Sequence, residues 1–183
     1  MFERDLGDGD RLRTLTEDDA PELFALVDAN RADLRRWLPW VDGTVSVDDV
    51  RAFVRGATER AAAGRGLTAA IVAGGRIAGV IGFHDVDAVH RSTSIGYWLA
   101  EACRGRGLVT RSVRVLVDHA FREWEVVRVE IRCAVGNTAS RAIPERLGFR
   151  LEGVLRRAEN LGGRFVDVAV LSMLDDEWAP GGR

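Results

Sequence analysis

The hydrophobic pattern of the chain is strongest between residues 94 and 124. An apolar strand is predicted first, from Ile95, Tyr97, Trp98 and Leu99. From Val109 to Trp124 apolar residues recur at intervals of three and four, which is the spacing of one buried helix face. The loop between them, residues 104–107, reads Arg-Gly-Arg-Gly. This stretch therefore predicts a strand, a glycine-broken basic turn and an amphipathic helix in direct succession.

Hydrophobic periodicity and turn residues divide the rest of the chain into strands and helices. Strands are predicted at residues 11–15, 67–73, 76–86, 126–135, 149–161 and 165–174. Helices are predicted to begin at the caps Thr16, Ser46 and Asn137. The order predicts an α/β protein with a mixed central sheet of about seven strands flanked by about four helices. Without a repeat or linker, residues 1–183 are expected to form a single domain.

Composition excludes several functional classes. The net charge of −2 gives no reason to expect a nucleic-acid partner. No apolar run approaches the roughly 18 residues of a membrane span, and residues 1–10 are acidic where a signal peptide would be basic. Cys103 and Cys133 lack metal-ligand spacing and are expected to be reduced thiols. We therefore expect a cytoplasmic protein that needs no metal.

The basic loop has the features of an anion site. The first amides of the following helix have no partner inside it, and the helix dipole adds partial positive charge there. Gly105 and Gly107 let the backbone approach a phosphate, and Arg104 and Arg106 supply charge. The chain contains no lysine, which excludes a Walker loop, and Thr110 stands where a dinucleotide fingerprint has its third glycine. The alternative is an arginine-rich surface turn.

The segment from Arg104 to Val109, directly after a strand that ends Gly-Tyr-Trp-Leu, resembles motif A of the GNAT superfamily of acyl-CoA N-acyltransferases. That motif has Arg or Gln, two residues, Gly, one residue, and then Gly or Ala. Val109 departs from the last small position but keeps its amide. The order of predicted elements matches the same fold. The resemblance implies that loop amides, including those of Leu108, Val109 and Thr110, bind the pyrophosphate of acetyl-CoA. It also implies that Trp98 and Leu99 bind the pantetheine arm and the acetyl carbonyl.

Three further segments are similar to the RimJ/RimL branch of that superfamily. They are Trp37-Leu-Pro-Trp40, Asn137-Thr-Ala-Ser140 with the following residues to Phe149, and residues 153–167. The branch is known for acetylating the N-terminal α-amine of ribosomal proteins. The resemblance therefore implies an acetyl-CoA-dependent N-acetyltransferase that acts on a primary amine, as a monomer or homodimer.

The same resemblance suggests catalytic residues. Ser140 occupies the position of a serine proposed to protonate the departing thiolate. Asn137 is either a plain helix cap or a cap that also binds the pantetheine arm. Ser140 is otherwise a helix serine that bonds its own backbone. Pro144 is expected to kink this helix, because it lacks an N–H and crowds the Ser140 carbonyl. Glu159 is the candidate base, directly or through water; the alternative is an exposed carboxylate paired with Arg156 or Arg157.

The sequence says less about the residues that would bind the acceptor amine. His84 is a rival base near the acceptor cleft. Trp37 and Trp40 are either core residues or an aromatic wall that clamps a peptide or a planar ring. Tyr97 and Trp98 are expected to pack within the sheet. Three functions stay open: acetylation of a protein or peptide N-terminus, acetylation of a small amine such as an aminoacyl nucleotide, an antibiotic or a polyamine, and a non-catalytic CoA-binding domain.

Overall fold

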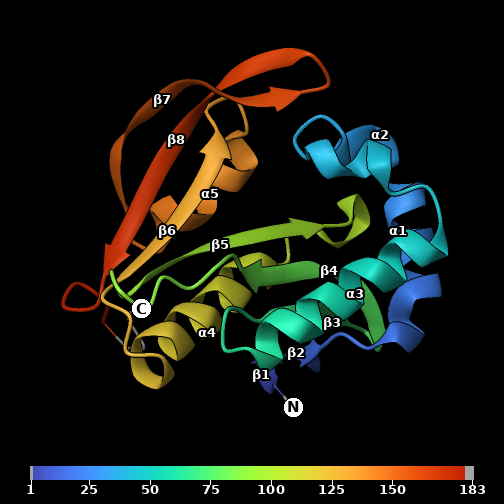
Figure 1. Cartoon of the computed structure of the whole chain (residues 1–183), viewed down its shortest axis with the longest axis horizontal. Coiled ribbons are helices and arrows are strands. Elements are labelled where there is room, and N and C mark those ends of the chain that lie inside the picture. The colour runs from blue at the N-terminus through green and yellow to red at the C-terminus, as the bar shows by residue number, and fades with distance from the viewer. Residues whose placement is uncertain (1, 180–183) are drawn as a thin grey trace.

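The computed structural model describes residues 2–179. Residues 1 and 180–183, the two ends of the predicted domain, lie outside the described part. One mixed sheet organises the fold, with strand order β1-β2-β3-β4-β5-β6-β8-β7 (Figure 1). The strands are β1 (Glu3–Gly7), β2 (Asp10–Thr14), β3 (Thr68–Ala73), β4 (Arg76–Phe83), β5 (Ser92–Leu99), β6 (Arg128–Ala134), β7 (Arg150–Leu161) and β8 (Arg164–Leu174).

Helices cover both faces of the sheet. They are α1 (Ala20–Ala29), α2 (Arg31–Leu34), α3 (Val47–Ala62), α4 (Leu108–Glu123) and α5 (Thr138–Arg146). The strand β3 shows why two layers form, because its side chains alternate between two clusters. Ala69 and Ile71 belong to the cluster that contains α4, whereas Ala70 and Val72 pack with residues of α1 and α3.

A divergence between β5 and β6 opens the sheet. These two strands are parallel and pair only over Ser92 to Ser94, whereas β5 pairs with β4 from Ile95 to Leu99. On its other edge β6 pairs with β8 along its whole length, from Arg128 to Ala134. Apart from the Leu99 carbonyl, which accepts from Arg104 at 3.4 Å, the backbone edge of β5 from Ile95 onward is therefore free on its β6 side, and its donors and acceptors are available to an extended ligand.

The fold confirms the predicted α/β class and adds two elements. The described residues contain eight strands and five α-helices. The added strand is β1, which forms a hairpin with β2 and buries only Leu6 of its five residues. The added helix is the short α2. The cap at Ser46 is a capping box: Ser46 Oγ accepts from the Asp49 N–H, and the Asp49 carboxylate accepts from the Ser46 N–H.

Pro144 does not interrupt its helix. The helix α5 continues through Pro144 to Arg146, and Asn137 caps it by accepting a hydrogen bond from the Ser140 N–H. The proline thus removes the N–H that would bond the Ser140 carbonyl without ending the helix, and the expected kink stays a prediction. Among residues 2–179, no helix combines the length and apolar character that crossing a membrane requires.

Candidate functional site: two cavities that meet at Ser140

Two cavities lie where β5 and β6 diverge. We call them the loop cavity, lined by residues of the loop before α4, and the central cavity, lined by residues that include His84 and Glu159. Their volumes are about 700 Å³ and about 660 Å³, respectively. Both are lined by Trp37, Leu38, Tyr97, Trp98, Asn137 and Ser140. A ligand in the loop cavity and a ligand in the central cavity would therefore meet beside these residues.

The start of α4 forms one wall of the loop cavity. Gly105 and Gly107 have φ values of +77° and +71°, a conformation that a side chain disfavours, and no atom lies within 4 Å of a Cβ added at either position. The first helical hydrogen bond runs from the Arg111 N–H to the Gly107 carbonyl. The amides of Leu108, Val109 and Thr110 therefore have no acceptor within the helix. All three residues line the loop cavity, which fits the predicted anion site.

Both loop arginines are paired with carboxylates, and only one of the two lines a cavity. Arg104 lines the loop cavity and is paired with Asp33. Arg106 is absent from the lining of both cavities and lies 3.5 Å from the carboxylate of the buried Asp10. Asp10 accepts a shorter bond, of 2.6 Å, from Arg111. The charge of Arg106 is thus turned toward the start of β2, and the expectation that it faces the ligand is not met in this arrangement.

Sequence reasoning missed Arg146, which also lines the loop cavity. Its guanidinium donates to Thr110 Oγ1 at 3.2 Å, and both residues line the cavity. No carboxylate lies within 4 Å of this guanidinium among the described residues. The two residues of this bond are 36 positions apart in the chain, so no local sequence motif predicts it.

Trp98 and Leu99 end the free edge of β5. Both line the loop cavity, and Trp98 also lines the central cavity. An unpaired strand edge is the arrangement that an extended ligand needs if it is to add main-chain hydrogen bonds. The prediction that these two residues face the bound arm of a cofactor is consistent with this placement.

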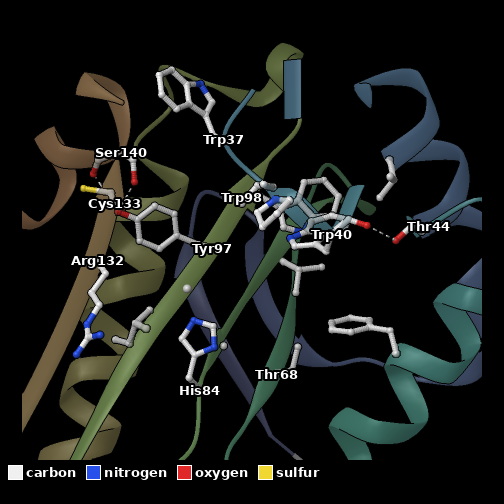
Figure 2. Close-up of a pocket in the computed structure, with 18 of the residues that line it drawn as sticks. Trp37, Trp40, Thr44, Thr68, His84, Tyr97, Trp98, Arg132, Cys133 and Ser140 are labelled. Atoms are coloured by element: carbon white, nitrogen blue, oxygen red, sulfur yellow. Dashed lines mark hydrogen bonds between the residues drawn. The ribbon is translucent and has the colours of Figure 1, made fainter. Parts of the chain in front are cut away.

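Ser140 and Tyr97 contact each other where the two cavities join. The Tyr97 hydroxyl donates to the Ser140 carbonyl at 3.0 Å, and Ser140 Oγ donates to the Tyr97 oxygen at 3.3 Å (Figure 2). Burial raises the pKa of Tyr97 above its usual value. Tyr97 packs against the main hydrophobic cluster, as expected, and its hydroxyl in addition reaches across the gap between β5 and α5.

Glu159 lies in β7 and lines the central cavity. Its burial raises its pKa, and neither Arg156 nor Arg157 forms an ion pair with it within the described chain. The alternative of a paired, exposed carboxylate is therefore not what the structure has. A bulge in the β7–β8 ladder between Leu155 and Glu159 includes Arg157 at φ +51°. Such a bulge redirects the side chains that follow it.

His84 follows β4 and lines the central cavity as predicted. A Cβ added at Gly96 would lie 2.7 Å from His84 Nε2, so the imidazole sits against the glycine of β5. Burial lowers the pKa of His84, and the charges of Arg60 and Arg132 lower it further. The neutral imidazole is thereby favoured at neutral pH.

The two tryptophans line the cavities instead of the core. Trp37 borders both cavities, and Trp40, which is 40% exposed, borders the central one. The rings of Trp40 and Trp98 are 6.0 Å apart and tilted by 51°, and Figure 2 shows them side by side. Together they form an aromatic surface on one side of the central cavity.

Cys133 is a second residue whose position the sequence did not reveal. It is a free, buried thiol in β6 that lines the central cavity, and Figure 2 shows it next to Ser140. Burial raises the pKa of Cys133 to about 11, so the thiol stays protonated at neutral pH. Residues 2–179 contain no group of three or more His, Cys, Asp or Glu side chains placed to hold a metal ion.

Comparison with known proteins shows which protein family has this architecture. A family model for the acetyltransferase (GNAT) domain matches residues 11–150. The chain is 36% identical over 179 residues to the putative ribosomal N-acetyltransferase YdaF of Bacillus subtilis, covering 97% of this chain and 98% of that one.

Solved structures agree with the family match. RimL, a ribosomal α-N-protein acetyltransferase in complex with coenzyme A, superimposes with a TM-score of 0.91 at 31% identity, over 94% of this chain and 98% of its own. The microcin self-immunity acetyltransferase MccE, in complex with acetyl-CoA and AMP, gives a TM-score of 0.87 at 29% identity, over 92% and 94% of the two chains.

The residues of the loop cavity fit acetyl-CoA. Two glycines leave open space beside free helix amides, and an unpaired strand edge leads from there to Ser140. These are the groups that a pyrophosphate and an amide-containing arm need. The chain therefore belongs to the GNAT acetyltransferase family, and it is an acetyl-CoA-dependent N-acetyltransferase.

Proposed function

We propose that this enzyme transfers the acetyl group directly to the α-amine of a protein or peptide N-terminus. The observation that carries the proposal is the junction of the two cavities at Ser140, with the unpaired Glu159 in the wall of the central cavity. An N-terminus can enter the central cavity while the cofactor occupies the loop cavity. The likeness to RimL and YdaF over nearly the whole chain supports a ribosomal-protein acceptor. Such an acceptor would place the reaction in the cytoplasm.

The binding roles follow from the loop cavity. The amides of Leu108, Val109 and Thr110 would hold the pyrophosphate, and Arg104 and Arg146 would add charge beside it. The free edge of β5 at Trp98 and Leu99, with Asn137 opposite, would hold the arm that carries the thioester. Bound acetyl-CoA supplies an activated acyl group, so no acyl-enzyme intermediate is needed.

The catalytic roles fall to Ser140 and Glu159. An α-amine has a pKa of roughly 7.7–8.0, so a modest base is enough to remove its proton near neutral pH. Glu159 would accept that proton, directly or through a water, and the rise in its pKa caused by burial makes it a stronger base than a solvated carboxylate. Ser140 would donate its hydroxyl proton to the departing thiolate. His84 is the rival base, and its lowered pKa keeps it neutral and able to accept.

A small planar amine is the second candidate acceptor. The observation in its favour is the aromatic surface formed by Trp40 and Trp98, which offers a stacking face for a nucleotide or drug ring. The likeness to MccE, whose complex contains AMP, supports the same candidate.

A thiol-release assay with acetyl-CoA separates the two candidates. One acceptor pool holds short peptides with free Ser, Ala or Met N-termini, and the other holds amino acids, aminoacyl nucleotides and amine antibiotics. We expect turnover with the peptides. Turnover confined to the small amines would replace the proposal with the second candidate. Thiol release that is independent of any acceptor would contradict both.

A further inference from the structure

The Ser140 carbonyl lacks its usual helical partner. In an α-helix the carbonyl of residue 140 accepts from the N–H of residue 144. Residue 144 is a proline, which has no N–H, yet α5 continues through it. An unsatisfied carbonyl away from water is costly, and Ser140 is half-buried, so a replacement donor stabilises this arrangement. The structure supplies one from another element: the hydroxyl of Tyr97, on β5, donates to this carbonyl at 3.0 Å.

The same hydroxyl also fixes the Ser140 side chain. Ser140 Oγ donates to the Tyr97 oxygen at 3.3 Å. This distance is long for a bond between two hydroxyls, which usually measures about 2.7–2.8 Å. The Ser140 proton can therefore turn to another acceptor at small cost. One tyrosine thus holds both the backbone and the side chain of the residue at the junction of the cavities.

We propose that Tyr97 is a positioning residue for acyl transfer, which replaces the amide removed by Pro144 and holds Ser140 Oγ at the junction of the two cavities, from where its proton can turn to the leaving sulfur. The inference rests on the proposed role of Ser140 as the proton donor. Tyr97 itself acts only through Ser140, because its own proton is committed to the Ser140 carbonyl. Burial also keeps the phenol protonated throughout the working pH range, so its hold on Ser140 does not change with pH.

The kinetic test uses Tyr97→Phe, which removes the hydroxyl and keeps the ring. Loss of one such hydrogen bond predicts a fall in kcat of about 3- to 10-fold, with the KM for acetyl-CoA unchanged. In a Ser140→Ala background, Tyr97→Phe should have no further effect on kcat. In a Pro144→Ala background its effect should shrink, because the restored amide can donate to the Ser140 carbonyl. Thr93→Val is the matched control: it removes a buried hydroxyl from the same strand and should leave kcat unchanged.

A spectroscopic readout tests the contact without turnover. Tyr97 is the only tyrosine of the chain, so protein labelled with 13C-tyrosine gives a single Cζ resonance. That resonance should shift in Ser140→Ala and in Pro144→Ala, and it should stay in place in Thr93→Val. The free protein is sufficient for this measurement.

Three results would overturn the inference. The first is an unchanged kcat in Tyr97→Phe while kcat falls in Ser140→Ala. The second is an effect of Tyr97→Phe on kcat that persists in full in the Ser140→Ala background. The third is a Tyr97 Cζ resonance that does not move in Ser140→Ala. A normal kcat in Ser140→Ala would instead refute the proposed proton donor. In that case the Cζ shift still decides whether Tyr97 and Ser140 are bonded.

Discussion

Three residues determine the position of Ser140. Asn137 caps its helix, Pro144 frees its carbonyl, and Tyr97 binds both that carbonyl and the hydroxyl. The first two are local and are evident in the sequence. The third joins positions 43 residues apart. A sequence pattern reports only nearby periodicity, so the cap was predicted and the tyrosine was not.

Replacing Ser140 by alanine tests its role as proton donor. If the hydroxyl protonates the leaving thiolate, turnover should fall by about 10²–10⁴, the usual range for general acid catalysis. Affinity for acetyl-CoA, measured by calorimetry, should change little, because the free helix amides bind the pyrophosphate. An unchanged turnover would assign the proton donor elsewhere.

Glu159 carries a prediction about stability and pH. Burial raises its pKa in the folded state above the unfolded value of roughly 4.3. The folded protein therefore binds more protons in this window, and the contribution of Glu159 to stability is lost as the pH rises through the folded pKa. Glutamine does not titrate. The free energy of unfolding of Glu159→Gln, relative to wild type, should thus increase as the pH rises from about 4 through the folded pKa of Glu159. Urea unfolding at several pH values measures this difference, and a flat or falling difference would contradict the assigned burial.

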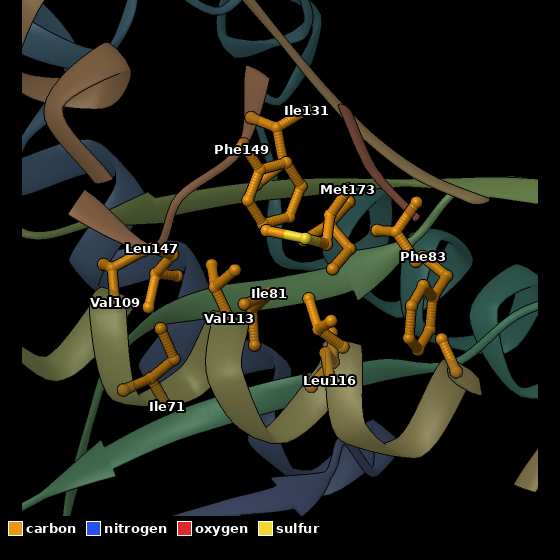
Figure 3. Close-up of a cluster of buried hydrophobic side chains, with 14 of the residues drawn as sticks. Ile71, Ile81, Phe83, Val109, Val113, Leu116, Ile131, Leu147, Phe149 and Met173 are labelled. Carbon is orange, nitrogen blue, oxygen red and sulfur yellow. The ribbon is translucent and has the colours of Figure 1, made fainter. Parts of the chain in front are cut away.

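At the scale of elements, α4 joins the core to the site. Its buried face, which includes Val109, Val113 and Leu116, packs against Ile71 and Ile81 of the sheet (Figure 3). The spacing of apolar residues predicted the start of this helix to within one residue. It did so because a helix that packs on one face places apolar residues at intervals of three and four. The same packing fixes the first turn, whose amides face the loop cavity.

The conformation of Gly107 permits a matched test of the loop. Glutamate at this position would place a negative charge against the pyrophosphate. A like charge about 4 Å away costs on the order of 4 kcal/mol at an effective dielectric of about 20, which is roughly a 10³-fold loss of affinity. Calorimetry with CoA measures this loss. Gly64→Glu is the control, because Gly64 has a similar φ of +67° with no atom near an added Cβ and lines neither cavity. Equal CoA affinity in the two variants would refute the anion site.

The hairpin of β1 and β2 shows where sequence patterning fails. Only Leu6 of β1 is buried, so the strand lacks the alternation of apolar and polar residues by which a strand is predicted. The hairpin nevertheless carries Asp10, a carboxylate that is 1% exposed and bonds Arg111 of α4 at 2.6 Å. It thereby ties the sheet edge to the helix that forms the loop cavity.

Removal of Asp10 should therefore destabilise the fold. Asp10→Ala leaves the Arg111 guanidinium without its closest partner, and we expect a loss of about 1–3 kcal/mol in the free energy of unfolding. The matched control is Asp42→Ala, which breaks the exposed pair with Arg35 and should cost about 0–1 kcal/mol. Urea unfolding compares the two. Equal losses in the free energy of unfolding would show that the buried ion pair stabilises the fold no more than the exposed pair does.

At the scale of the whole molecule, function depends on the incomplete pairing of one sheet. The strand β5 leaves β6 after three paired residues, and the two cavities open along the free edge. The sequence predicted the strands and their order along the chain. It did not reveal where pairing stops, because register depends on the packing of both halves against their helices and not on either strand alone.

The most direct test of the proposed acceptor locates the acetyl group on a product. A peptide with both a free α-amine and a lysine is incubated with the enzyme and acetyl-CoA, then fragmented in a mass spectrometer. The same peptide with a formylated N-terminus serves as the control. We expect a single acetyl group on the α-amine and no change in the formylated peptide. Acetylation of the lysine in both peptides, or of neither peptide while small amines are acetylated, would contradict an enzyme for protein N-termini.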